Sequence, residues 1–211
     1  MRLRDLEIAL ERCPPHPEPK AALEQYRTPA RLAAQVLYDA LAHGDIEGKR
    51  VADMGCGTGA LAIGAALLGA SYVVGVDIDE EALYIAERCA ERLDVDVEFV
   101  RSDVRNFSGA FDTVIMNPPF GYQAQGADRP FLSKALEIAS AIYTVHAAAS
   151  EGFVDSFIEE HGGRVLEKKS YKFEIPYTFS FHKMERRPTE VMVYHVRRDM
   201  SDVRRQDCVT R

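Results

Sequence analysis

The sequence predicts an α/β fold in which a doubly wound, mostly parallel sheet of seven strands ends in an antiparallel hairpin at its C-terminal edge. Two observations support this prediction. Between residues 49 and 163, short β-rich runs alternate with segments of helical periodicity, as expected for parallel strands joined by right-handed helical crossovers. The runs at 164–175 and 190–198 then follow without a helix between them, so they are expected to pair as the hairpin. The predicted architecture is Rossmann-like.

Each element has its own signal in the sequence. Leucines at helical spacing predict a short helix over residues 3–10, and several prolines follow it. A longer helix is expected to start at Thr28, whose hydroxyl can cap it, with Pro29 in its first turn and Gly44 at its end. The alternating segments that follow predict strands at 49–54, 71–79, 95–100, 111–116 and 142–147, and helices at 61–69, 80–93, 131–141 and 151–163.

Length and composition indicate one domain. A chain of 211 residues with 46% hydrophobic content can enclose one substantial core and a pocket. Residues 1–198 are expected to form a single domain, in which residues 1–45 are a helical leader that closes the ligand site. Residues 199–211 are expected to be a tail that is either disordered or a basic contact.

The sequence also bears on the compartment and on metal binding. Because no apolar run is long enough to span a membrane and the N-terminus is charged throughout, we expect a cytoplasmic protein with no membrane partner. The four cysteines lie singly, without the paired spacing of a zinc site. This pattern predicts free thiols and no metal site.

The charge is unevenly distributed along the chain. The net charge is −7, yet residues 161–211 contain 12 Lys and Arg against 7 Asp and Glu. A basic C-terminal part on an acidic body fits a nucleic-acid partner, and it fits an ordinary solvated surface equally well. Charge alone therefore leaves the partner open.

A glycine-rich turn follows the first predicted strand, and open α/β sheets bind ligands at this end of their strands. The turn reads DMGCGTG over residues 53–59, and its glycines let a ligand approach the backbone. Asp77 ends the second strand, where a carboxylate can accept both hydroxyls of a ribose, and Asp103 follows the third strand, placed to meet an adenine edge. Each feature alone also fits a plain turn or a loop acid. Their common position at the carboxyl ends of successive strands favours a nucleoside ligand.

The acid at the start of this turn distinguishes between cofactors. Asp53 would repel the pyrophosphate of a dinucleotide and attract a cationic amino-acid group. S-adenosylmethionine has such a group, a positive sulfonium, and a ribose and adenine that suit Asp77 and Asp103, so it is favoured over NAD. With this site and its edge hairpin, the chain resembles the class I methyltransferases over most of its length.

The fourth predicted strand ends in Asn117, Pro118, Pro119 and Phe120. Class I methyltransferases with an NPPF or NPPY segment here methylate planar exocyclic or amide nitrogens, which are poor nucleophiles because their lone pairs are delocalised. By this resemblance, the Asn117 side-chain oxygen and the Pro118 carbonyl accept the hydrogens of the target NH2 group. The prolines fix the backbone, and Phe120 stacks on a planar base. The alternative is a structural turn with Phe120 packed in the core.

The segments LEQYRTPARLAA, LGASYVVGVDIDEEAL, NPPFGYQAQGADRPFL and SYKFEIPYTFSFHK are similar to the small-subunit ribosomal RNA adenine-N6 methyltransferases of archaea and eukaryotes. The resemblance implies methylation of an adenosine at N6 in small-subunit ribosomal RNA, with S-adenosylmethionine as cofactor. Position 58, often Cys in eukaryotic relatives, is Thr here. The expected cofactor contacts are Gln25, Thr28, Asp53, Gly55, Gly57, Thr58, Gly59, Asp77, Asp103, Val104 and Asn117.

The resemblance further implies an RNA site and a protein partner. A flipped adenine would stack on Phe120, and Tyr122 lies in a loop that can close over it. Lys183, Arg186 and Arg187 are candidates for phosphate contacts. A small zinc-finger methyltransferase activator protein is a candidate partner that would cover an exposed edge of the sheet.

Two other functions stay open at this point. A protein-glutamine N5 methyltransferase uses a related segment, usually with Tyr in place of Phe120, and has an extra N-terminal domain. A non-catalytic cofactor-binding ribosome-assembly factor would need the cofactor site without turnover.

Overall fold

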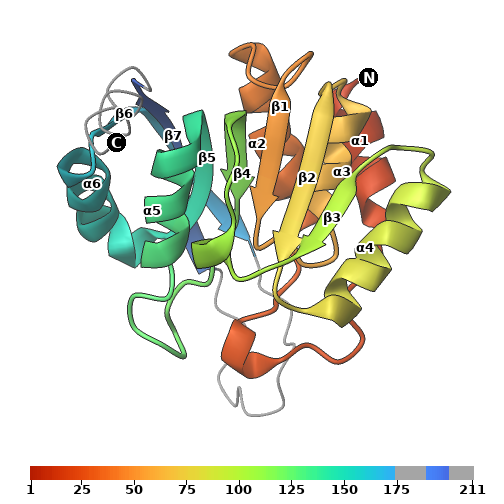
Figure 1. Cartoon of the computed structure of the whole chain (residues 1–211), viewed down its shortest axis with the longest axis horizontal. Coiled ribbons are helices and arrows are strands. Elements are labelled where there is room, and N and C mark those ends of the chain that lie inside the picture. The colour runs from red at the N-terminus through yellow and green to blue at the C-terminus, as the bar shows by residue number, and fades with distance from the viewer. Residues whose placement is uncertain (174–188, 200–211) are drawn as a thin grey trace, which may run out of the picture.

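The computed structural model describes residues 1–173 and 189–199, and its centre is a seven-stranded sheet (Figure 1). The strands lie in the order β3-β2-β1-β4-β5-β7-β6. Strands β1 to β5 are parallel, β7 is antiparallel to β5, and β6 pairs antiparallel with β7. The strands are β1 (Arg50–Met54), β2 (Tyr72–Asp77), β3 (Glu98–Arg101), β4 (Phe111–Met116), β5 (Ala139–Ala147), β6 (Gly163–Phe173) and β7 (Thr189–Arg198). The predicted fold class is confirmed.

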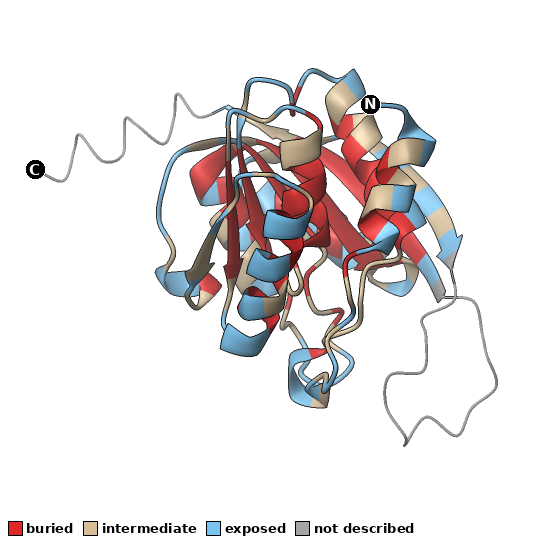
Figure 2. Cartoon of the chain, turned by 90° about the vertical axis from the view of Figure 1, so that its right-hand side faces the viewer, coloured by how far each residue is buried: buried red, intermediate tan, exposed pale blue. Residues whose placement is uncertain are grey.

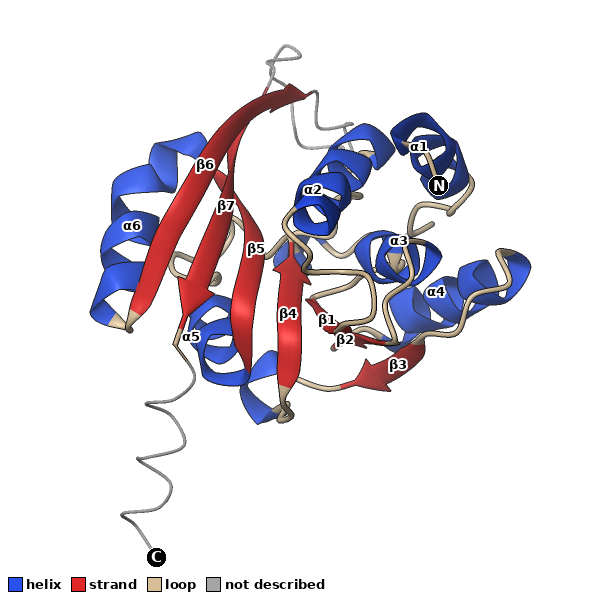
Figure 3. Cartoon of the chain, turned by 90° about the horizontal axis from the view of Figure 1, so that it is seen from above, coloured by secondary structure: helices blue, strands red, loops and turns tan. Residues whose placement is uncertain are grey.

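Helices cover both faces of this sheet (Figure 3). They are α1 (Leu3–Glu11), α2 (Ala30–Ala42), α3 (Ala60–Leu67), α4 (Glu80–Arg92), α5 (Arg129–Ile138) and α6 (Glu151–Glu160). The four helices α1, α2, α3 and α4 pack on one face of the sheet through one apolar cluster. Helices α5 and α6 pack on the other face through a second cluster. Neighbouring strand residues enter opposite clusters, such as Ile115 and Val114 of β4, because successive strand side chains point to opposite faces. Figure 2 shows the resulting buried interior.

No helix in the described part of the chain is both long enough and apolar enough to cross a membrane.

The start of α2 differs from the sequence prediction. The helix begins at Ala30, Pro29 is its N-cap residue, and no side chain caps it. The prediction of a Thr28 cap, with Pro29 inside the first turn, is therefore wrong. The physical reason is competition, because the Thr28 hydroxyl instead accepts a hydrogen bond from Asn117, a residue distant in the sequence.

The boundary between α5 and β5 is also displaced. The sequence predicts a helix over 131–141, but α5 ends at Ile138 and β5 begins at the next residue. Ala139 and Ala141 are buried and pair with Phe111 and Thr113 of β4, so the sheet takes up the end of the predicted helix. Pairing in the sheet here outweighs the helix propensity of alanine.

Candidate active site

A cavity of about 830 Å³ opens at the carboxyl ends of the parallel strands. Its volume is in the range of pockets that hold cofactors. The wall combines the turn after β1, the ends of β2 and β3, the segment after β4, and leader residues between Pro15 and Thr28. In Figure 1 this leader segment, with the short helix η1 (Ala21–Leu23), lies below the strand ends. The predicted site residues that line the cavity are Gln25, Thr28, Asp53, Gly55, Gly57, Thr58, Asp77, Asp103, Val104, Asn117 and Pro119.

Backbone donors hold Asp77 at the end of β2. Its carboxylate accepts the Gly57 N–H at 2.7 Å and the Asp79 N–H at 2.9 Å. Burial raises the pKa of Asp77, and these two bonds limit the rise. Gly57 has a φ of +52°, and a Cβ placed on it would meet no atom within 4 Å. The turn therefore presents a carboxylate and open backbone to a ligand.

Gly59 serves a different purpose from Gly57. A Cβ on Gly59 would lie 2.9 Å from the Cβ of Ala86 in α4, and its φ is +83°. The residue lies outside the cavity lining, so close packing between α3 and α4 explains the glycine. Its predicted contact with a cofactor stays a prediction.

Asp53 is 1% exposed, and its carboxylate accepts the Ala62 N–H at 2.9 Å. Burial, together with the nearby Asp77 carboxylate, raises the pKa of Asp53 to about 8. At neutral pH the group therefore mostly holds a proton. A cationic group beside Asp53 would favour release of that proton. We therefore expect Asp53 to take on the negative charge predicted from the sequence when such a ligand binds.

The turn after β3 forms another part of the wall. Asp103 caps the short helix η2 (Val104–Asn106) by accepting the Arg105 N–H at 2.9 Å. The Arg105 guanidinium also bonds this carboxylate and lowers the pKa of Asp103 to about 2. Val104 is buried beside it. Ile78 also lines the cavity and is 49% exposed, which gives apolar surface that the sequence analysis missed.

The leader orients Asn117. The Asn117 amide nitrogen donates to the Thr28 hydroxyl at 2.9 Å. The Asn117 side-chain oxygen is buried and has no hydrogen-bond partner in the described part of the chain. A buried acceptor without a partner costs about 1 to 3 kcal/mol and is uncommon. Because Asn117 also lines the cavity, a ligand is the natural source of the missing donor.

The aromatic end of the same segment is packed inward. Phe120 is 9% exposed, and its ring centroid lies 5.1 Å from that of Tyr26 and 5.9 Å from that of Tyr122. Phe120, Pro118 and Tyr122 lie outside the cavity lining, and Tyr122 is 63% exposed. Stacking of a base on Phe120 would therefore require a neighbouring ring to move.

The predicted phosphate contacts Lys183, Arg186 and Arg187 lie outside the described residues.

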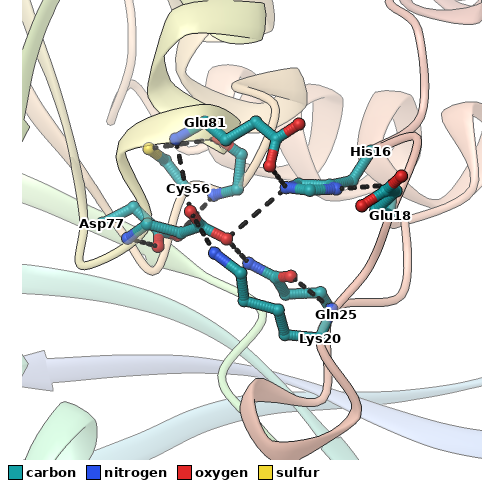
Figure 4. A network of polar contacts seen from close by, with 9 residues as sticks. His16, Glu18, Lys20, Gln25, Cys56, Asp77 and Glu81 are labelled. Carbon is teal, nitrogen blue, oxygen red and sulfur yellow. Dashed lines mark hydrogen bonds and ion pairs between the residues drawn. The ribbon is translucent and has the colours of Figure 1, made fainter.

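A polar network joins the leader to the turn after β2 (Figure 4). Asp79 accepts hydrogen bonds from the Lys20 ammonium at 2.8 Å and from the Gln25 amide at 2.6 Å. The Gln25 side-chain oxygen accepts the backbone N–H of Lys20 at 2.7 Å, so both ends of this amide are occupied. Burial alone would raise the pKa of Asp79, but the bonds from Lys20 and Gln25 bring it to about 2. Gln25 thus ties the leader to the sheet.

Comparison with known proteins agrees with this geometry. The family model described as "Methyltransferase small domain" matches residues 31–141. The chain belongs to this methyltransferase family. It is similar to the rRNA N(6)-adenosine-methyltransferase METTL5 of Danio rerio, with 38% identity over 191 residues that cover 87% of this chain and 92% of the relative. The protein MJ0284 of Methanocaldococcus jannaschii is 39% identical over 208 residues, covering 93% and 94%.

A solved structure extends the comparison. The crystal structure of PH1948 from Pyrococcus horikoshii matches this methyltransferase with a TM-score of 0.88 and 42% sequence identity. The match covers 94% of this chain and 98% of that one. The two proteins therefore share their fold over nearly the whole length of both chains.

Sequence analysis missed a second residue at the site of this methyltransferase. Glu24 is 8% exposed and contacts the segment after β4 rather than solvent. A glutamate in a charged leader is typical of a solvated surface. Its position beside Gln25 was the one signal that could have drawn attention to it.

Proposed function

We propose that this methyltransferase transfers a methyl group from S-adenosylmethionine to N6 of an adenosine in ribosomal RNA, and that this RNA is that of the small subunit. The main observation behind this proposal is Asn117. It lines the cavity, and its buried side-chain oxygen has no hydrogen-bond partner among the described residues, so it needs a donor such as an exocyclic NH2 group. The relative named rRNA N(6)-adenosine-methyltransferase supports the class of substrate.

The walls of the cavity fit S-adenosylmethionine in their chemistry. Asp77 can accept ribose hydroxyls, and Ile78 and Val104 supply apolar surface for an adenine. Asp53 can balance a positive charge, and Gly57 leaves room beside the backbone. When bound, the cofactor supplies a methyl group activated by its sulfonium.

The residues after β4 would bind and orient the target amine. The Asn117 oxygen accepts one hydrogen of the amine, and the Pro118 carbonyl accepts the other, which draws the nitrogen lone pair out of conjugation with the base. Thr28 holds the Asn117 amide, which fixes the orientation of the acceptor before the substrate arrives. Leader residues form part of the cavity wall, where they would limit the access of water once the ligands are bound.

Methyl transfer from labelled S-adenosylmethionine into total RNA and total protein tests this function. Label is expected in RNA, as N6-methyladenosine, and mapping should place it in small-subunit ribosomal RNA. Label in protein alone would instead favour glutamine methylation, and cofactor binding without any transfer would favour an assembly factor. Label in large-subunit RNA would overturn only the assignment to the small subunit.

The proposal includes a protein partner and cytoplasmic action. β3 is the outermost strand on its side of the described sheet, and an edge strand suits a covering partner. The candidate is a small zinc-finger methyltransferase activator protein. Co-expression should yield a stable complex with a higher rate of RNA methylation, whereas separate elution of the two proteins and an unchanged rate would exclude this partner.

A further inference from the structure

Glu24 lies where the leader meets the segment after β4. It directly follows η1 and has a left-handed backbone with a φ of +50°. Its buried carboxylate accepts three backbone N–H groups, from Phe120 at 2.7 Å, Gly121 at 3.2 Å and Gln123 at 2.8 Å. Bonds to a charged acceptor are stronger than bonds between neutral groups, so three of them make a firm anchor.

The same part of the leader holds the other end of this segment. Thr28 accepts the Asn117 amide at 2.9 Å, whereas Glu24 holds Phe120. Between these anchors lie Pro118 and Pro119, whose rings fix their φ angles. With both ends held, the leader limits how this segment can move.

The leader also reaches the ribose side of the cavity. Gln25, the neighbour of Glu24, donates to Asp79, and the Asp79 N–H donates to Asp77. Adjacent leader residues therefore contact the segment proposed to hold the substrate and the turn proposed to hold the cofactor. A displaced leader would disturb both.

We propose that Glu24 is a positioning residue for methyl transfer, in that its carboxylate holds residues 117–123 where Asn117 and Pro118 can meet the target amine. This inference rests on the proposed function, although the anchor itself needs no substrate. Glu24→Gln keeps the size of the side chain but turns an NH2 group toward backbone donors. A misplacement of about 1 Å costs on the order of 100-fold in rate, so we expect turnover to fall about 10-fold to 100-fold.

The experiment compares the full-length parent, Glu24→Gln, Glu24→Ala and the matched control Glu11→Gln, whose side chain is exposed at the end of α1. Hydrogen exchange of peptides covering 117–128, measured without RNA, reports the anchor directly. Single-turnover methylation of ribosomal RNA at saturating cofactor reports positioning. Calorimetric titration with S-adenosylmethionine shows that each variant is folded. Its affinity should stay within about threefold of the parent because Lys20 and Gln25, which hold the leader to Asp79 beside Asp77, are unchanged.

The expected result is about tenfold faster exchange near Phe120 and slower turnover in both Glu24 variants, with parental behaviour in Glu11→Gln. Parental exchange in Glu24→Gln and Glu24→Ala would overturn the anchor. Faster exchange with parental turnover would overturn the positioning role. If the parent itself fails to methylate RNA, the proposed function fails, and the exchange data alone decide whether Glu24 holds the segment.

Discussion

Cofactor affinity is expected to depend on pH through Asp53. In the free protein the pKa of Asp53 is about 8, so at pH 6 only about one molecule in a hundred has this carboxylate ionised. If a cationic ligand binds beside ionised Asp53, binding must release the proton. The binding constant should then rise about tenfold per pH unit, or about 1.4 kcal/mol, from pH 6 toward pH 8.

The rise should end near pH 8 for two reasons. Asp53 is half ionised there, and an α-amino group has an ordinary pKa of about 7.7 to 8.0, so the ligand begins to lose its own positive charge. Asp53→Asn is the matched variant, because its amide oxygen can still accept the Ala62 N–H but it has no proton to release. Its binding constant should therefore be nearly flat between about pH 6 and pH 7.5.

Isothermal titration calorimetry across this pH range measures the slope. Repeating the titration near pH 6.5 in buffers with different ionisation enthalpies counts the protons released. The parent should release about one proton and Asp53→Asn none from this group. Equal parental affinity at pH 6 and pH 8, with no proton released, would refute the role assigned to Asp53.

Three further predictions concern the cofactor, the chemistry and the RNA. Asp77→Ala should weaken S-adenosylmethionine binding tenfold or more, about 1.5 to 3 kcal/mol for bonds to a charged group, and an unchanged dissociation constant in a folded variant removes Asp77 from the ribose site. Asn117→Ala should lower the rate of single-turnover methylation by about 100-fold while RNA affinity changes little. Near-parental turnover would mean that residues 117–120 are only a structural turn. Replacing Lys183, Arg186 and Arg187 with Ala should reduce the salt slope of RNA binding by about 2 to 3, whereas an identical slope means that these charges are only solvated.

The order of strands and helices could be predicted from the sequence because hydrophobic periodicity is a local property. The boundary between α5 and β5 could not, since the run EIASAI at 137–142 fits a helix as well as a strand until β4 pairs with it. The Thr28 cap failed for a related reason. A threonine before a proline is a good local cap, but its partner Asn117 is 89 positions away.

The acidic residues of the site show where sequence reasoning stops. Asp53, Asp77 and Asp103 could be placed together because parallel strands bring their carboxyl ends to one edge. Their protonation could not be predicted, since burial raises the pKa of Asp53 to about 8 while Arg105 lowers that of Asp103 to about 2. Arg105 is visible two residues along the chain, whereas the burial of Asp53 exists only once α3 covers it.

Glu24 was harder to find than any of these acids, and the reason is the chemistry of its partners. An acid that pairs with lysine or arginine leaves a second charged residue in the sequence as a signal. The Glu24 carboxylate is instead satisfied by backbone N–H groups of Phe120, Gly121 and Gln123, which almost any residue could supply. Such an anchor depends on the shape of the loop rather than on its composition. It can be recognised only when the folded backbone turns its donors toward one point.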